Sequence, residues 1–544
     1  MDILTNLSKK EKEVIHSAIL PIIAKIFFAI LIASGFWYIT ANNFDPDLGW
    51  HLRVGEQIVN TGEIPRHDTF SHTMPGFEWI DHEWLVDAWL WRMQDLNLWW
   101  LVTAVFATLA FLPFLIWIIR AQRLSWLWII LLGALSAMPF IGIRPQMISF
   151  FLFFIVFEMF SALGAKHWRW AVLPVIFFIW ANLHGGFITG LILFASFLIA
   201  QRIPQALLNW KLWKFNFHRL ASNSTAMPRA QYNMALISFI ASILATLINP
   251  YGWKLYDEIF TAITSPYVMK YILEWLSIAS SGNIFILVFL ALFLALFINY
   301  WRQYPIAVLL PTALFFMMGV KSMRNFPLFL IVALPFIFSA TEILRRDAIK
   351  SQELAPISAR IWLALRLVII TLFIIPIAHT GYSMWHKKGE NGRYPEKAVS
   401  FMEQKIKSGE WDNPTILNDY AQGGYLIWRL PEVKVFIDGR MPHWQDKDGN
   451  SAMKDYIAII RSDDMEEKKN ILKKRGVNTI IATNKFEKEV NKNQLLKNNG
   501  AARIIKRING FFYGESNTNL KEELIKDGWD VTYEDRAAII LRHE

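Results

Sequence analysis

Residues 44–87 read FDPDLGWHLRVGEQIVNTGEIPRHDTFSHTMPGFEWIDHEWLVD and lie between two long apolar segments. From residue 45 to residue 95, ten side chains are acidic and three are basic: Asp45, Asp47, Glu56, Glu63, Asp68, Glu78, Asp81, Glu83, Asp87 and Asp95 against Arg53, Arg66 and Arg92. We interpret this stretch as a carboxylate-rich loop held against a membrane face, and we expect the chemistry of the protein to lie there.

The rest of the chain has the composition of a polytopic α-helical membrane protein. It is 54% hydrophobic and contains 25 Trp and 41 Phe in 544 residues. Several apolar runs reach the roughly 18–20 residues that cross a bilayer. We predict eleven spans, near residues 19–40, 99–119, 126–142, 146–163, 171–186, 187–207, 233–249, 284–301, 305–320, 326–343 and 361–380.

The charges of the links between spans predict the orientation. Lys and Arg gather in alternate links, which the positive-inside rule places in the cytoplasm, whereas the first loop is strongly acidic. The N-terminus is therefore expected inside and the acidic loop outside, and an odd number of spans puts the C-terminus outside too. This bias also accounts for the net charge of +10 without nucleic acid as a partner. The absence of cysteine excludes disulfides and thiolate metal sites.

A second domain follows the membrane region. We predict a transmembrane domain over residues 1–380, with its external loop at 42–98, and a soluble extracytoplasmic α/β domain over residues 381–544, where charged residues become frequent. Its expected strands are 415–417, 433–437, 477–482 and 537–541. Its expected helices lie near 395–408, 451–462, 464–475 and 519–527.

Two helices are predicted inside the acidic loop. Asp45 followed by Pro46 is typical of a helix N-cap and first position, and Gly62 of a helix stop. Such a helix places Asp47 and His51 on one face, since residues four apart are neighbours. A second helix, near 81–95, carries three Trp residues that favour a membrane–water boundary.

The loop offers several candidate site residues, each with a structural alternative. Asp45 and Asp47 could bind a divalent cation or act as a general base, or could serve only as helix caps. His51 and Arg53 could hold an anionic headgroup or line a wet interface helix. His82 and Glu83 could line a substrate cavity or pack the loop. They are no HExxH zinc site, because residue 86 is Val.

Further polar residues lie at the predicted external ends of later spans: Arg144, His184, Lys254, Glu274, Lys321 and Arg324. Cations at span ends commonly anchor a protein to lipid headgroups. External basic residues nevertheless run against the positive-inside bias, and a polyprenyl phosphate needs guanidinium partners. We prefer Arg324 as the phosphate ligand and expect these residues to share the outer pocket with the loop carboxylates.

The densest segment of the predicted outer domain is NDYAQGGYLIWRLPEVKVFIDGR, residues 418–440. Gly423 and Gly424 permit close backbone approach, and Asp438-Gly439 is typical of a turn that ends a strand. Two interpretations remain open: a buried strand pair with its turns, or a surface that contacts an acceptor.

The first loop resembles a known enzyme family. DPDLGWHLRVGEQIVNTGEIPRHDTF is similar to the first external loop of archaeal and bacterial oligosaccharyltransferase catalytic subunits, membrane glycosyltransferases of the GT-C superfold, in its DxD-like motif, its HLR helix and its IP-x-x-D segment. NDYAQGGYLIWRL occupies the place of that family's WWDYG motif, although the match is limited to DY and GY. The resemblance implies that Asp45 or Asp47 contacts acceptor or metal, and that Arg324 binds the lipid-linked phosphate.

The sequence also departs from this family. After the third span it has Arg144-Pro145-Gln146 and no carboxylate, and the nearest substitute for a later glutamate is Glu274. A Mg²⁺ or Mn²⁺ ion held by Asp47 and Glu274 and metal-independent transfer, as in the protein mannosyltransferase and aminoarabinose transferase branches, are therefore both open.

We thus expect a transferase in a prokaryotic plasma membrane that acts in the cell envelope. It would move a sugar or oligosaccharide from a polyprenyl-phosphate or polyprenyl-pyrophosphate donor to a protein or glycan acceptor, among membrane lipids. The alternatives are a non-enzymatic transporter or flippase of lipid-linked glycans, which would carry ionisable residues at mid-membrane, and a structural assembly subunit with dispensable loop carboxylates.

Overall fold

The computed structural model of the protein describes residues 9–161, 168–207, 227–350, 394–412, 414–462, 464–483 and 520–543. The chain divides into two compact units. Unit 1 comprises Met1–Phe44, Trp99–Pro250 and Ser277–Lys388, and unit 2 comprises Asp45–Leu98, Tyr251–Leu276 and Gly389–Glu544. The acidic loop, which the sequence analysis grouped with the membrane spans, therefore belongs to unit 2. The boundary predicted at residue 380 lies outside the described residues.

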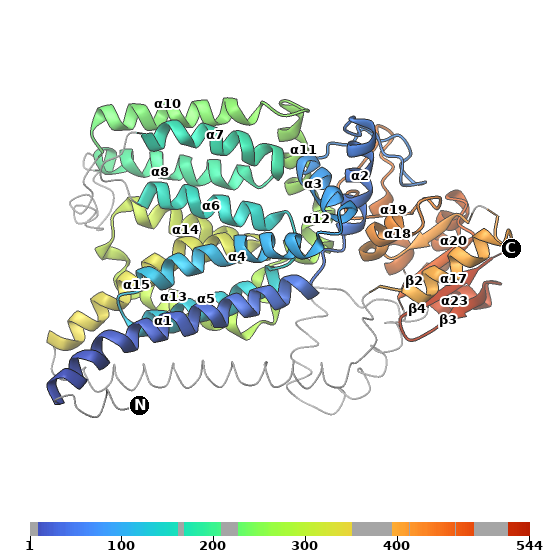
Figure 1. Ribbon diagram of the computed structural model, residues 1–544. Coiled ribbons are helices and arrows are strands. Elements are labelled where there is room, and N and C mark those ends of the chain that lie inside the picture. Colours follow the sequence, from blue (N-terminus) through green and yellow to red (C-terminus); the bar gives the residue numbers. More distant parts are fainter. Residues whose placement is uncertain are drawn as a thin grey trace. The chain divides into compact units, whose positions relative to one another are not determined.

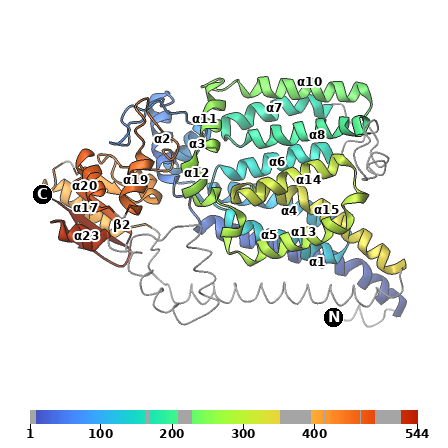
Figure 2. The ribbon, with the colours of Figure 1, turned by 180° about the vertical axis from the view of Figure 1, so that it is seen from behind.

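Unit 1 is a bundle of apolar helices that run side by side in both views (Figures 1 and 2). Its helices are α1 (Lys9–Asn42), α4 (Trp99–Arg120), α5 (Leu124–Ala137), α6 (Gln146–Ser161), α7 (Trp168–Leu183), α8 (Phe187–Leu207), α10 (Arg229–Thr246), α13 (Ile284–Tyr300), α14 (Ile306–Lys321) and α15 (Phe326–Lys350). Each span predicted before residue 350 falls on one of them, and the span at 361–380 lies outside the described residues.

These helices make the chain an integral membrane protein. Within the described residues, four segments are long and apolar enough to cross a bilayer: Ile19–Asn42, Trp99–Arg120, Ile284–Gln303 and Met323–Ala348. Other apolar helices are shorter, so the number of crossings stays a prediction. The segment Met323–Ala348 is 72% buried and Ile19–Asn42 only 17%. Helix α15 is therefore central in the bundle, and α1 is peripheral.

Unit 2 contains two helices from the acidic loop, α2 (Leu48–Thr61) and α3 (Trp84–Asp95). Gly62 ends α2 in the left-handed conformation, with φ of +72° and its N–H donated to the Ile58 carbonyl, as predicted. The two helices pack closely, because a Cβ on Gly55 would lie 2.0 Å from the Asp87 carbonyl oxygen. The other helices of unit 2 are α11 (Lys254–Thr264), α12 (Pro266–Tyr271), α17 (Glu396–Lys407), α18 (Gly423–Arg429), α19 (Ala452–Arg461), α20 (Met465–Lys474) and α23 (Leu520–Lys526).

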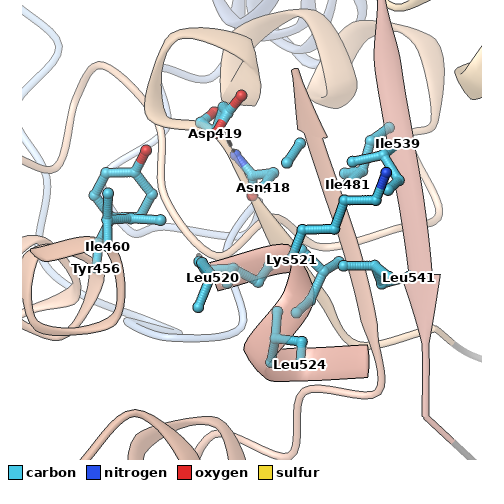
Figure 3. Close-up of a pocket in the computed structure, with 13 residues that line it drawn as sticks. Asn418, Asp419, Tyr456, Ile460, Ile481, Leu520, Lys521, Leu524, Ile539 and Leu541 are labelled. Carbon is cyan, nitrogen blue, oxygen red and sulfur yellow. Dashed lines mark hydrogen bonds between the residues drawn. The ribbon is translucent and has the colours of Figure 1, made fainter. Parts of the chain in front are cut away.

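The C-terminal part of unit 2 is an α/β structure, as expected. Its sheet has the order β1 (Ile416–Asn418), β2 (Thr479–Thr483), β4 (Ala538–Arg542) and β3 (Asp530–Glu534). Strand β1 is parallel to β2, and the other pairs are antiparallel. Strand β3 was not predicted from the sequence. Its residues are mostly exposed at the sheet edge, where charged side chains are common. A pocket of about 30 Å³, with room for about one water, lies between this sheet, α19 and α23 (Figure 3).

The acidic loop forms part of the core of unit 2. Residues 433–437, predicted as a strand, instead make a single parallel bridge between Val435 and Ser71 of the loop. Val435 donates its N–H to the Phe70 carbonyl over 2.9 Å, and the Thr73 hydroxyl donates to the Phe436 carbonyl over 2.6 Å. Trp50 and Trp79 of the loop join the buried cluster that holds Phe436. The loop is therefore built into the same folded unit as the C-terminal segment.

Candidate active site

Asp47 lies at the start of α2 but does not cap it. The helix begins at Leu48, two residues later than the Asp-Pro pattern predicted, and no side-chain bond caps its N-terminus. The Asp45 carboxylate instead accepts the Asp47 N–H over 3.0 Å, in a local turn. The prediction that Asp45 is the N-cap was thus wrong, because Asp45 makes this turn instead. The Asp47 carboxylate makes no capping bond and lies against another segment of unit 2.

That carboxylate lies against the backbone of the Ile437–Arg440 segment. A Cβ built on Gly439 would lie 1.8 Å from Asp47 Oδ1, and one on Gly424 would lie 2.5 Å from the Pro46 carbonyl oxygen. Any side chain at these positions would need Asp47 or its backbone to move. The close approach that the sequence indicated for the glycine pair 423–424 is confirmed. The buried strand pair that we considered for residues 418–440 is not observed, because Gly423–Arg429 forms helix α18.

A buried ion triad holds the segment that contacts Asp47. Arg440 donates from Nε and Nη2 to the Asp438 carboxylate over 2.8 and 2.6 Å, and its Nη2 lies 2.9 Å from Asp68 Oδ1 in the acidic loop. Its guanidinium also lies about 5 Å from the ring centres of Phe70, Trp79 and Trp444. The triad ties Asp438, and with it Gly439, to the loop that carries Asp47.

The electrostatic environment of Asp47 raises the pKa of its carboxyl group. Burial raises the pKa of Asp47 to about 7; the carboxylates of Asp45 and Asp438 add to this rise, and His51 opposes it. A general base is most effective when its pKa lies near the working pH. Asp47 meets that condition at neutral pH.

His51 lies inside a carboxylate network. It is only 2% exposed, its Nδ1 lies 2.7 Å from Asp87 Oδ1, and its Nε2 lies 3.6 Å from Glu83. Glu83 is also buried, and its other oxygen lies 3.8 Å from His82 Nε2. Burial raises the pKa of Asp87 well above its usual range. Both ring nitrogens of His51 therefore face protein carboxylates, which favours a positioning role for His51 in this network.

Arg53 connects α2 to α18. Its Nη2 donates to the Trp428 carbonyl over 2.9 Å, its guanidinium lies over the Trp428 ring, and Nη1 pairs with Glu56. These contacts hold the two helices together, so Arg53 supports the wall of the site through α18.

Tyr420 is a site residue that the sequence analysis did not single out. Burial raises its pKa well above the usual range, and the charges of Asp47, Asp438 and Glu274 add to that effect. Glu274 lies half-buried in a short 3₁₀ turn, Leu273–Trp275. Tyr420 thus lies within the field of both carboxylates that were predicted as metal ligands. Its only sequence signal was the DY pair in the place of the family's motif.

Unit 1 carries a separate constellation at the ends of its helices. His184 is buried after α7, and its Nδ1 accepts the Gly186 N–H over 2.8 Å. Ser149 Oγ lies 2.7 Å from the same nitrogen and accepts the indole N–H of Trp180 over 2.6 Å, so its own proton points to His184. These contacts on Nδ1 hold the imidazole ring of His184 in place.

Arg324 lies beside His184. Its Nη2 is 3.4 Å from His184 Nε2, and a guanidinium can only donate. Arg324 keeps further N–H groups, which suit an anionic acceptor such as a phosphate oxygen. Arg144 lies in the turn before α6, and Lys321 is exposed at the end of α14.

Similarity to known proteins is found at the level of structure. No family model matches the sequence, and no curated protein matches it. Solved structures of the oligosaccharyltransferase from Archaeoglobus fulgidus do match. The one with an inhibitory peptide and a dolichol-phosphate has 10% identity and a TM-score of 0.49, and covers 85% of this chain and 70% of that one. The apo form has 10% identity over the same shares and a TM-score of 0.46. The form tethered to a peptide with the NVT sequon has 11% identity, 87% and 70% coverage, and a TM-score of 0.46.

These structures belong to the family that the first loop resembles.

The predicted site residues fall into two groups. Asp45, Asp47, His51, Arg53, His82, Glu83 and Glu274 all lie in unit 2, whereas Arg144, His184, Lys321 and Arg324 lie in unit 1. Within unit 2, the structure adds Asp68, Asp438, Arg440 and Tyr420 to the first group. Within unit 1, it adds Ser149 and Trp180 to the second.

Proposed function

We propose that this protein is a membrane glycosyltransferase that moves a sugar or oligosaccharide from a polyprenyl-phosphate or polyprenyl-pyrophosphate donor to a protein or glycan acceptor, on the outer face of a prokaryotic plasma membrane. The observation that carries the proposal is the Asp47 carboxylate, with a pKa of about 7, held against Gly439 by a buried ion triad. The resemblance of the first loop supplies the donor and acceptor classes.

Asp47 would act as the general base of the transfer. The acceptor nucleophile attacks the anomeric carbon of the donor sugar and forms the new glycosidic bond. The bond between that carbon and the phosphate oxygen breaks, and the lipid phosphate leaves with the electron pair. Asp47 takes the proton that the acceptor loses. A positioned base of this kind contributes about 10²–10⁴-fold to a rate.

His184 and Arg324 would bind the phosphate. Negative charge develops on the leaving phosphate as its bond to the sugar breaks, and preorganised donors stabilise that charge. The ring of His184 has a fixed orientation because Gly186 and Ser149 hold Nδ1. The guanidinium of Arg324 supplies the positive charge beside it.

A divalent cation of the Mg²⁺ or Mn²⁺ type is an alternative at this site. No group of three or more His, Asp or Glu side chains is placed to hold a metal within the described residues. Mg²⁺ is commonly held by one or two carboxylates and takes its other ligands from water and substrate phosphates. In this alternative to metal-independent transfer, Asp47 and Glu274 would be these carboxylates, since the charges of both act on Tyr420. Such an ion would neutralise phosphate charge and lower the pKa of Asp47, so Asp47 would then be a ligand and not the base.

The pH profile tests the role of Asp47. The reconstituted full chain would be given radiolabelled lipid-linked sugars, extracted from membranes of its host, with envelope protein as acceptor. Below pH 7 Asp47 is increasingly protonated and cannot accept a proton, so kcat/KM should rise about tenfold per pH unit up to about pH 6.5 and level off above 7. A flat profile from pH 5 to 8 would contradict the role of Asp47 as base.

Removal of the Arg324 guanidinium, which would donate hydrogen bonds to the phosphate, tests the proposed phosphate site in unit 1. Arg324→Gln should lower kcat/KM for the lipid-linked donor by about 10–150-fold, the value of one charge-assisted hydrogen bond. Arg302→Gln is the matched control, because Arg302 is exposed at the end of unit 1 away from His184 and should leave kcat/KM unchanged. Equal losses in the two variants would argue against a phosphate site at Arg324.

A further inference from the structure

A cavity of about 410 Å³ opens in unit 1, at the end of the bundle away from His184 and Arg324. It lies between the last turns of α4 and α6, the first turn of α5 and the second half of α15. Its walls include Trp117, Trp126, Phe157 and Phe338. Trp126 and Phe338 stack with ring centres 5.0 Å apart. The proposed transfer uses none of these residues.

Cations crowd one carboxylate at the rim of this cavity. Glu342 lies 2.7 Å from Arg345 Nη2, 3.3 Å from Arg123 Nη2 and 3.5 Å from Arg346 Nε. One carboxylate can balance one of these three guanidiniums, so a positive excess remains around Glu342. Asp347, next to Arg346 in the chain, also acts on Tyr300 of α13.

A fourth guanidinium lies on the other side of the cavity. Arg120 Nη1 donates to Glu158 over 2.5 Å, and its side chain is 60% exposed. A guanidinium has five N–H donors, so Arg120 and Arg346 each keep donors that can reach an anion at the mouth. Around the cavity, four guanidiniums thus surround two carboxylates.

A side chain of the cavity wall also carries a buried donor. Trp117 is 4% exposed, and its indole Nε1 has no hydrogen-bond acceptor within the described residues. A buried N–H without an acceptor costs free energy, which a bound ligand with an oxygen acceptor would recover. This observation is independent of the charges at the rim.

We propose that this cavity binds the headgroup of an anionic phospholipid. The phosphate would lie between Arg120 and Arg346, and an ester oxygen would accept the Trp117 N–H. The aromatic walls would contact the upper part of the acyl chains. The positive-inside pattern predicts that this end of the bundle faces the cytoplasm, where anionic lipids give the inner leaflet its negative potential. Basic cavities between membrane helices on that side suit such headgroups.

Native mass spectrometry of the purified full chain tests the proposal. The protein would be titrated with phosphatidylglycerol, with phosphatidylcholine and with glycerol phosphate, a soluble phosphate without acyl chains. Phosphatidylglycerol should bind at least about tenfold more tightly than either of the others, because it alone supplies both the net charge and the chains. Equal binding of phosphatidylcholine, or tighter binding of glycerol phosphate, would overturn the proposal.

Variants locate the site. Arg120→Gln combined with Arg346→Gln should weaken phosphatidylglycerol binding about tenfold or more, whereas Arg302→Gln, at the same end of the bundle but outside the cavity, should not. Trp117→Phe keeps the ring and removes the N–H, so it should weaken binding several-fold even if the double variant does not fold. The proposal would be refuted if Trp117→Phe bound phosphatidylglycerol with wild-type affinity and Arg302→Gln lost as much affinity as the double variant. Binding would then depend on general charge attraction and not on this cavity.

Discussion

Asp47→Asn should lower kcat for transfer by about 10²–10⁴-fold while the protein still inserts and folds. The amide has nearly the same shape as the carboxylate and fits against Gly439, but it cannot take a proton from the acceptor. The substitution also removes a negative charge from a group of carboxylates. Because the charges of Asp45 and Asp438 raise the pKa of Asp47, the folded protein should be no less stable without the Asp47 charge. Single-turnover transfer of labelled lipid-linked sugar measures the loss, and thermal unfolding verifies the fold.

Asp95→Asn is the matched control for that substitution. Asp95 lies in the same acidic loop, at the end of α3, and pairs with Arg92 at the surface over 3.4 Å. Exposed ion pairs of this kind contribute little to stability, so the control should retain wild-type transfer. Undiminished transfer by Asp47→Asn would exclude Asp47 as the base. Equal loss in both variants would indicate that the loop needs only its overall charge.

Much of the local structure of unit 2 could be predicted from the sequence. The stop at Gly62, the helices α17, α19, α20 and α23, and the strands β1, β2 and β4 follow from patterns within a few residues. Such patterns are informative because amphipathic spacing and glycine conformation are local properties of the chain. The edge strand β3 was not predicted, because its exposed residues lack the alternation of apolar and polar side chains that a half-buried strand shows.

The composition of the site could be predicted only in part. The DPD motif drew attention to Asp47, but its pKa depends on Asp438, which lies almost 400 residues further along the chain. The Arg440 triad joins Asp68 to Asp438 in the same way. Without a second sequence for comparison, no local pattern reveals which distant carboxylate a buried arginine will meet. The contact between Asp47 and Gly439 is a property of the folded unit.

The same reasoning explains the error at residues 433–437. Their apolar, β-branched character fits a strand, yet residues 70–73 of the loop provide the pairing partner at a single bridge. The segment is buried because the acidic loop covers it, a contact across more than 350 residues. The strand propensity of these residues was read correctly, but tertiary packing determined their backbone conformation.

Gly439→Ala is the second substitution with a large expected effect. The new Cβ would lie 1.8 Å from Asp47 Oδ1 and 2.4 Å from Asp47 Cγ, distances that real atoms do not keep. Either Asp47 must leave its place, or the Ile437–Arg440 segment must move against the buried Arg440 triad. We expect transfer to fall by about 10²-fold or more, and stability by about 1–3 kcal/mol, the usual cost of an overpacked site.

A double-mutant cycle separates the effect on Asp47 from a general defect in unit 2. In the background of Asp47→Ala, which removes the clashing oxygens, Gly439→Ala should cost little stability, since the methyl group enters the space that the carboxylate leaves. Because neither single variant retains the positioned base, the losses in transfer should not add. Additive effects on both thermal stability and transfer would mean that the two residues act independently. The position of Asp47 would then not depend on the space that Gly439, which has no side chain, leaves for its carboxylate.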